Sequence, residues 1–218
     1  MKWFAKMTWL MCLLLILSVT AACSAADVPE VPSDPDDNGQ EDPAGPDEPG
    51  NELHWDESIE TTIQIEGMDE PITLNLLETE RFITYVPENM STTVDGERVR
   101  VFAAFGGTPV EDAYLEIIFL PGLSAEPTLN ELSDALDLDD FEINLSDPAD
   151  HIHNWSVLEF YSHSHPEYSL SGALGVRDGQ TFVALMHYPW EYGDGFEPRA
   201  KMILDYLHWT PSGEPLNP

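Results

Sequence analysis

Residues 24–53 carry six prolines and ten acidic residues, with almost no apolar side chains between them. A segment of this composition cannot bury enough apolar surface to offset the loss of chain entropy, so we expect it to stay disordered. Its prolines and unbalanced charge favour an extended chain, which at about 3.1 Å per residue reaches on the order of 90 Å. The folded part of the chain is therefore confined to residues 54–218, a length typical of a single domain with one hydrophobic core.

One stretch of this segment has an alternative interpretation as a calcium site. Residues 34–39 read Asp-Pro-Asp-Asp-Asn-Gly and match the start of a calcium-binding loop. Such a loop also needs a bidentate glutamate at its twelfth position, which is Gly45 in this sequence. We therefore interpret the segment as a polar tether that attracts counterions without a specific site.

The chain begins with the three parts of an export signal. Lys2 and Lys6 make a basic start, residues 7–17 are largely apolar, and residues 18–22 are mostly small. The stretch between Lys6 and Cys23 is short for a transmembrane helix, which needs about 20 residues. We therefore predict a signal peptide over residues 1–22.

The residues around the predicted cleavage point resemble the bacterial lipobox. Residues 20–23 are a threonine, two alanines and Cys23, and Thr20 stands where the lipobox usually has leucine. The resemblance implies that a diacylglyceryl group is attached to Cys23 before the signal is cut. The alternative is an ordinary secretory signal, cut near Ala22 or Ala26, with an incidental cysteine.

Lipidation would decide where the domain is located. Two or more acyl chains hold a protein stably at a membrane, whereas one chain holds it only marginally. The lipobox interpretation therefore predicts a lipid-anchored protein at the extracytoplasmic face of the cell membrane, with Cys23 and its tether spanning residues 23–53.

The charge of the chain excludes one class of partner. The sequence has 41 Asp and Glu residues against 8 Lys and Arg residues, and two of the lysines would leave with the signal. A field of this sign repels nucleic acid, and the remaining basic residues form no dense patch, so we exclude nucleic-acid binding. Cys12 also lies in the signal, so we expect no disulfide and no thiolate metal ligand in the domain.

Apolar residues alternate with polar ones in the first half of the domain. Strands are predicted at 59–65, 72–76, 82–86, 98–105 and 114–120, with a turn at 67–71 that makes the first two a hairpin. A helix is predicted next, because Thr128 and Glu131 have the spacing of a capping box and Leu129, Leu132 and Leu136 share one face.

The second half repeats this order of strands followed by a helix. A strand is predicted at 155–161, a hairpin at 168–176 and 181–188, and a helix at 194–208 that begins with a capping box of Asp194 and Glu197, with Pro198 in its first turn. Strands, helix, strands, helix predict an α+β fold, in which an antiparallel β-sheet is covered by two packed helices as an α/β sandwich.

Part of this pattern resembles the PsbP-like α/β sandwich. The resemblance rests on residues 85–87 (Tyr-Val-Pro), an apolar and aromatic strand at 182–189 and a final amphipathic helix at 201–209, and it spans residues 82–209. This group includes extrinsic proteins of photosystems and many bacterial lipoproteins. The resemblance implies the fold and supplies no catalytic residues.

Two pairs of histidines are the clearest candidates for metal ligands, namely His151 with His153 and His163 with His165. Histidines two residues apart on a strand face the same side and suit zinc or copper, with Asp150 or Glu167 as a third ligand. Extended chain between the pairs would separate them by roughly 30–40 Å, so we do not expect one joint site. The alternative is surface imidazoles bonded to backbone or water.

Aromatic residues gather between Tyr188 and the C-terminal Trp209. Trp190 and Tyr192 lie in a loop before the last predicted helix, where exposed rings would suit stacking on a sugar or a peptide. The alternative is that these rings pack between the helix and the sheet.

The sequence contains no nucleophile elbow, zinc-protease, P-loop or Rossmann fingerprint. We therefore expect no enzyme activity and no cofactor. The first functional hypothesis is a non-catalytic binding or accessory module in the cell envelope, which contacts an envelope protein or a wall glycan. The alternative is a metal-binding lipoprotein that uses the His-x-His pairs for zinc or copper.

Overall fold

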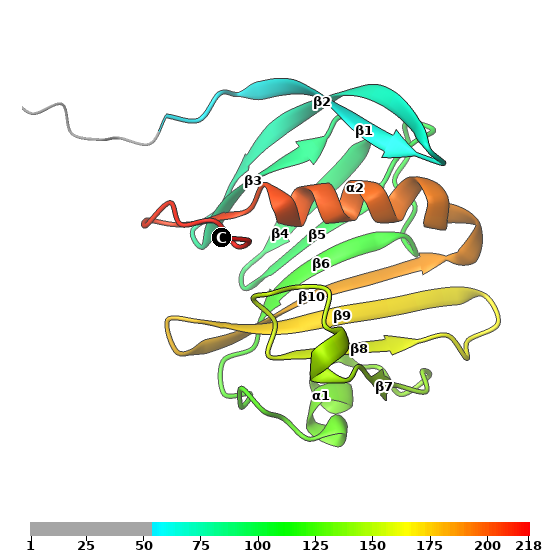
Figure 1. Cartoon of the computed structure of the whole chain (residues 1–218), viewed down its shortest axis with the longest axis vertical. Helices are drawn as coiled ribbons and strands as arrows, with labels where there is room; N and C mark the ends of the chain where they lie inside the picture. The colour runs from blue at the N-terminus through cyan, green and yellow to red at the C-terminus, as the bar shows by residue number, and fades with distance from the viewer. Residues whose placement is uncertain (1–53) are drawn as a thin grey trace, which may run out of the picture. The chain divides into compact units, whose positions relative to one another are not determined.

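The computed structural model describes residues 54–218, so the predicted signal peptide, the Cys23 lipidation site, the tether and its calcium-loop motif lie outside the described residues. Within this range the strands form two antiparallel sheets, accompanied by two α-helices (Figure 1). The predicted α+β class is therefore confirmed, with the strands divided between two sheets. Neither of the helices in this range is long and apolar enough to cross a membrane.

The smaller sheet begins with the predicted hairpin. Its order is β1 (Ser58–Ile65), β2 (Met68–Glu78), β3 (Phe82–Pro87) and the short β11 (His208–Trp209). Only Glu66 and Gly67 lie between β1 and β2, and their φ angles of 50° and 78° suit a two-residue turn of type I′. The predicted turn over residues 67–71 is therefore wrong, because residues 68–71 already pair with β1.

The larger sheet has the order β4 (Met90–Asp95), β5 (Arg98–Ala103), β6 (Tyr114–Phe119), β10 (Gln180–Pro189), β9 (Tyr168–Arg177), β8 (Leu158–Ser162) and β7 (Asn144–Leu145). The sequence analysis missed β4, since the polar residues 91–93 interrupt any apolar alternation. The strand predicted at 155–161 begins only at Leu158, because the preceding residues form a loop that follows the short 3₁₀ helix Pro148–Asp150.

The two helices differ in how well their ends were predicted. At the start of α1 (Leu129–Leu136), Thr128 and Glu131 form the expected capping box. α2 (Gly193–Asp205) instead continues from a 3₁₀ turn, Trp190–Tyr192, and has no side-chain cap. The predicted capping box of Asp194 and Glu197 is therefore wrong, and Pro198 lies inside the helix.

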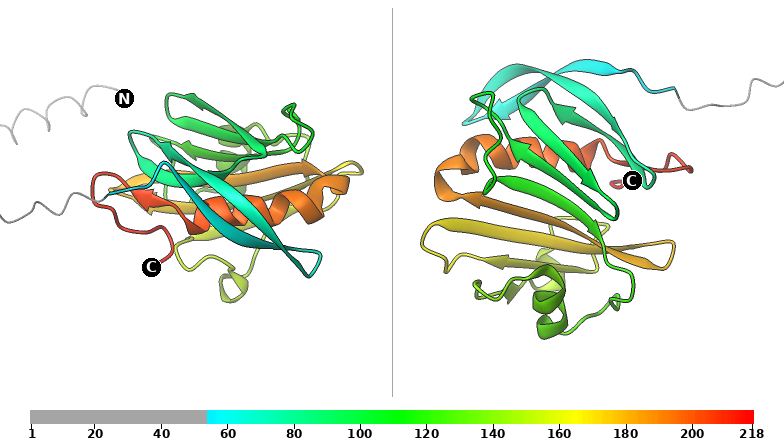
Figure 2. Two further views of the ribbon diagram at one scale, coloured as in Figure 1. Left: turned by 90° about the horizontal axis from the view of Figure 1, so that it is seen from above. Right: turned by 180° about the vertical axis from the view of Figure 1, so that it is seen from behind.

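α2 lies between the smaller sheet and one face of the larger sheet, where it contacts β1, β3 and β10 (Figures 1 and 2). The largest core cluster joins Phe196, Ala200, Ile203 and Leu204 of α2 to Phe182, Ala184 and Met186 of β10. The intervening residues of β10, Val183 and Leu185, share a second cluster with Leu132 of α1. Alternate residues of a strand face opposite sides, so α1 and α2 cover opposite faces of the larger sheet.

Candidate binding cleft between α2 and strands β8 to β10

Small side chains on β9 leave space beneath α2. Ser169, Ser171 and Ala173 stand opposite Tyr188, Met186 and Ala184 of β10 in the antiparallel register. Directly opposed residues share one face of a sheet, so these three small residues face α2 with their partners. The larger Leu170 and Leu174 alternate with them and join the cluster on the α1 side.

A cavity of about 290 Å³ lies between these small residues and α2. Its lining includes Glu159 and Tyr161 of β8, Ser169 and Ser171 of β9, Tyr188 of β10, Glu197 and Lys201 of α2, and also His153 and His163. The volume lies near the lower end of the range for small-molecule sites, which is about 300–1,000 Å³. The space therefore suits a ligand of the size of one or two rings.

The α2 side of the cleft carries an ion pair. Lys201 Nζ lies 2.6 Å from Glu197 Oε1, and the hydroxyl of Tyr188 donates a hydrogen bond of 3.1 Å to Glu197 Oε2. Burial raises the pKa of Tyr188, so its phenol stays protonated and acts as a donor. The Glu197 carboxylate is therefore engaged at both oxygens by the protein itself.

A second carboxylate, that of Glu159, holds the neighbouring loop. It accepts hydrogen bonds from the backbone N–H groups of Ile152 at 3.0 Å and His153 at 2.7 Å, and from the Ser156 hydroxyl at 2.9 Å. Burial raises the pKa of Glu159, but these hydrogen bonds together outweigh burial, so the net pKa lies below the ordinary value. Glu159 thus stays ionised and draws residues 152–156 against the sheet.

This loop brings together two histidines that the sequence analysis expected to lie far apart. His153 and His163, one from each predicted pair, line the same cavity. The expected separation of roughly 30–40 Å assumed extended chain. That assumption is wrong, because β8 begins only at Leu158 and the residues before it turn back toward Glu159. Burial lowers the pKa of His153, so its ring is neutral at pH 7.

The remaining members of the pairs have other partners. His151 Nδ1 lies 3.2 Å from the Ser156 hydroxyl, and His165 Nδ1 accepts hydrogen bonds from the backbone of Glu167 and Tyr168. Within residues 54–218, no three His, Cys, Asp or Glu side chains lie close enough together to hold a metal ion. The structure therefore does not gather the four histidines into a ligand set.

Three aromatic rings stand beside the cleft and are called the aromatic platform below: Tyr161, His163 and Trp190. The ring centroid of His163 lies 5.0 Å from that of Tyr161 and 5.9 Å from that of Trp190. Trp190 is 45% exposed, and its Nε1 donates a hydrogen bond to the carbonyl of His165, which fixes the ring. Tyr161 and His163 also line the cavity, so the platform leads into it.

Tyr192 does not belong to this platform, although the sequence analysis grouped it with Trp190. Its ring stacks on that of Phe105 with a centroid distance of 6.2 Å, and it packs against the largest core cluster. The predicted aromatic loop is therefore divided, with Trp190 on the cleft side and Tyr192 packed as the alternative interpretation expected.

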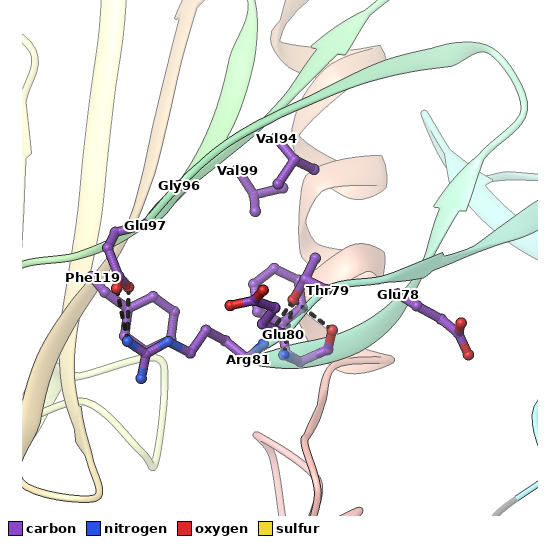
Figure 3. A pocket seen from close by; sticks show the side chains of 10 residues that line it. Glu78, Thr79, Glu80, Arg81, Val94, Gly96, Glu97, Val99 and Phe119 are labelled. Carbon is purple, nitrogen blue, oxygen red and sulfur yellow. Dashed lines mark hydrogen bonds and ion pairs between the residues drawn. The ribbon is translucent and has the colours of Figure 1, made fainter.

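A larger hollow of about 570 Å³ lies between the two sheets, and the side chain of Arg81 extends across it (Figure 3). Arg81 Nη2 lies 2.8 Å from Glu97 Oε1, its Nη1 donates to Gln180 Oε1 at 2.9 Å, and its guanidinium lies 5.0 Å from the centre of the Phe119 ring. No sequence motif marks Arg81. Its polar atoms bind other parts of the protein, so it connects the smaller sheet to the larger one.

The cleft beneath α2 leaves two hydroxyl groups open. Among the described residues, the Tyr161 and Ser171 hydroxyls make no side-chain hydrogen bond, and neither oxygen is among the buried polar atoms that lack a partner. Both residues line the cleft. We therefore take the cleft, with the aromatic platform beside it, as the candidate functional site.

No model of a known protein family matches the chain, and no curated protein matches it. Among solved structures, the chain is similar to cyanobacterial PsbP (CyanoP) from Synechocystis sp. PCC 6803, with a TM-score of 0.39 and 12% identity over 62% of this chain and 92% of that one. A protein from Bacteroides thetaiotaomicron VPI-5482 has a TM-score of 0.35 and 16% identity over 61% of this chain and 46% of its own length.

Proposed function

We propose that this chain is a non-catalytic binding module of the cell envelope, anchored by lipid on Cys23 at the extracytoplasmic face of the membrane. Its cleft between α2 and β8 to β10 would receive part of an envelope protein or of a wall glycan. The observation that carries this proposal is a cavity with open hydroxyls at Tyr161 and Ser171 beside an exposed aromatic platform.

The arrangement of charged groups in the cleft supports binding in preference to catalysis. Glu197 is paired with Lys201, and Glu159 is held by the loop that it binds. Because the protein's own groups hold both carboxylates in place, this side of the cleft suits a rigid binding surface.

The export signal and the lipobox support the proposed location. A tether that reaches on the order of 90 Å would let the domain contact structures well away from the bilayer. No observation among residues 54–218 favours zinc or copper binding by the histidine pairs, so the metal hypothesis is not carried further.

The proposal is tested by envelope binding of the full-length lipoprotein. Detergent-solubilised protein is incubated with purified wall sacculi, and in parallel with envelope proteins of the same cells under chemical cross-linking. We expect wild type to bind one of the two, and the Trp190→Ala variant to lose most of this binding.

Phe105→Ala is the matched control, because Phe105 is 41% exposed but stacks on Tyr192, outside the platform. Wild-type binding that is no stronger than binding of an unrelated acidic lipoprotein would contradict the proposal. Equal loss in the Trp190 and Phe105 variants would show that the cleft is not the site.

A further inference from the structure

Resting on the proposed function, we infer that the ligand of the cleft is an uncharged, polyhydroxylated molecule, namely a sugar ring of a neutral glycan. The inference depends on which charges in the cleft are already balanced, which polar groups remain open and what the aromatic platform offers.

The charged side chains of the cleft already have partners within the protein. Lys201 and Glu197 form an ion pair of 2.6 Å, so this side of the cleft has no net charge. Glu159 carries a charge, but its carboxylate accepts three hydrogen bonds from the loop and is 6% exposed. A charged ligand would have to compete with these partners for the same charged groups.

The cleft also offers open polar groups. They include the hydroxyls of Tyr161 and Ser171, the imidazole of His163, and the imidazole of His153, which burial keeps unprotonated. A hydroxyl both donates and accepts a hydrogen bond, and a neutral imidazole does the same with its two nitrogens. Sugar hydroxyls have the same dual capacity, so they match this set more closely than a carboxylate or an ammonium group would.

The aromatic platform supplies the apolar part of the contact. Trp190 has its N–H bound to the carbonyl of His165, which leaves the ring face as its free surface. A pyranose ring carries C–H groups on one face and hydroxyls around its edge, so it stacks on an aromatic ring while its edge reaches polar groups. The platform and the cleft meet at Tyr161 and His163, so the stacking contact and the polar contacts lie next to each other.

The net charge of the chain excludes one further class of ligand. At −33, the protein repels anionic ligands, including acidic polysaccharides, before they reach the cleft. Cationic ligands are attracted in general, yet the two carboxylates of the cleft already hold Lys201 and the loop. Neutral sugars are not repelled by the net charge, and they do not need these carboxylates as partners.

The test uses calorimetric titration of the full-length lipoprotein in a detergent that has no sugar headgroup. The neutral probes are chitotriose, cellotriose and maltotriose, the cationic probe is the de-N-acetylated counterpart of chitotriose, and the anionic probe is trigalacturonate. We expect at least one neutral trisaccharide to bind and neither charged one. Trp190→Ala should weaken that binding about tenfold, as loss of one stacked ring predicts.

Three further variants make the result specific. Tyr161→Phe and Ser171→Ala each remove one open hydroxyl and should weaken binding several-fold, whereas Trp190→Phe keeps a ring and should restore part of the affinity. Phe105→Ala should bind like wild type. Thermal unfolding of each variant verifies that it is folded before its affinity is compared.

The outcomes separate this inference from the proposed function. Binding of a charged probe alone, or neutral binding that Trp190→Ala leaves unchanged, overturns the sugar inference. If no probe binds while wild type still cross-links to an envelope protein through the platform, the sugar inference fails and the proposed function stands. If neither probes nor envelope fractions bind, both fail.

Discussion

Glu159 illustrates how a single buried carboxylate organises this site. It is 6% exposed and bonds the backbone N–H groups of Ile152 and His153. A carboxylate in such a position is stabilised by charge-assisted hydrogen bonds, which are stronger than neutral ones. This anchor acts together with Trp155, whose ring stacks on that of Phe182 and packs the loop against the core.

We predict that Glu159→Gln lowers the free energy of unfolding by about 1.5–3 kcal/mol at pH 7, because a charged acceptor of three hydrogen bonds is lost. The folded pKa of Glu159 is lowered, so its contribution is complete above the ordinary glutamate pKa of about 4.3 and is lost as pH falls through the folded pKa. Urea unfolding at pH 7 and pH 3 should therefore show a smaller difference between variant and wild type at pH 3.

Glu60→Gln, which changes an exposed carboxylate on β1, is the control and should leave stability nearly unchanged at pH 7. If Glu159→Gln differed from wild type by the same amount at pH 7 and pH 3, its ionised form would not be the source of the stabilisation.

At the scale of one strand, Gly172 of β9 packs too closely against the ring of Phe160 to accept a side chain. An added Cβ at Gly172 would lie 2.3 Å from Cζ of the Phe160 ring. We predict that Gly172→Ala lowers the free energy of unfolding by about 1–3 kcal/mol, since overpacking displaces a buried ring. Thermal or urea unfolding measures this change.

Gly106→Ala is the matched control, because an added Cβ there meets nothing within 4 Å and its φ is not positive. Its unfolding should be unchanged or slightly shifted toward stability. Equal destabilisation of the two variants would mean that loss of glycine, and not contact with Phe160, is responsible.

The hairpin of β1 and β2 has a turn residue that can be improved. Glu66 has a φ of 50°, a conformation that asparagine adopts more readily than glutamate. We predict that Glu66→Asn raises the free energy of unfolding by about 0.5–1 kcal/mol, because asparagine followed by glycine favours the type I′ turn. The measurement is the urea midpoint.

Glu60→Asn makes the same charge change within β1, where asparagine is disfavoured, and should not stabilise the protein. A rise of equal size in both variants would point to reduced charge repulsion as the cause.

At the scale of the whole molecule, location depends on the segment before the domain. We predict that the intact mass of the mature product lacks residues 1–22 and includes added acyl mass at Cys23. Cys23→Ser should move the protein from the detergent phase to the aqueous phase in a phase-partition experiment, because one serine cannot carry the anchor. A wild-type product that retains Met1, or carries no acyl mass, would contradict this prediction.

Much of the fold could be predicted because its signals are local. The hairpin of β9 and β10 follows from two largely apolar segments around Asp178 and Gly179, whose φ angles are 51° and 75°. The cap of α1 follows from Thr128 and Glu131, three residues apart. In contrast, β4 is an edge strand rich in serine and threonine, and it forms because β5 offers it a pairing partner.

The candidate site could be predicted only in part. Trp190 and the histidines stood out in the sequence, but Glu197 and Lys201 were simply residues of an amphipathic helix, and Glu159 was one acidic residue among many. The start of α2 was also misjudged, since the 3₁₀ turn at 190–192 leads into it without a capping side chain.

The sequence by itself determined the α+β class, the strand hairpins and the first helix, because period, turn residues and caps act over a few neighbouring positions. Only the tertiary structure decided that the strands form two sheets and that His153, Ser171 and Lys201 line one cavity. The physical reason is that a cavity depends on which small residues of one element face a distant element, and that relation is set by packing across the chain.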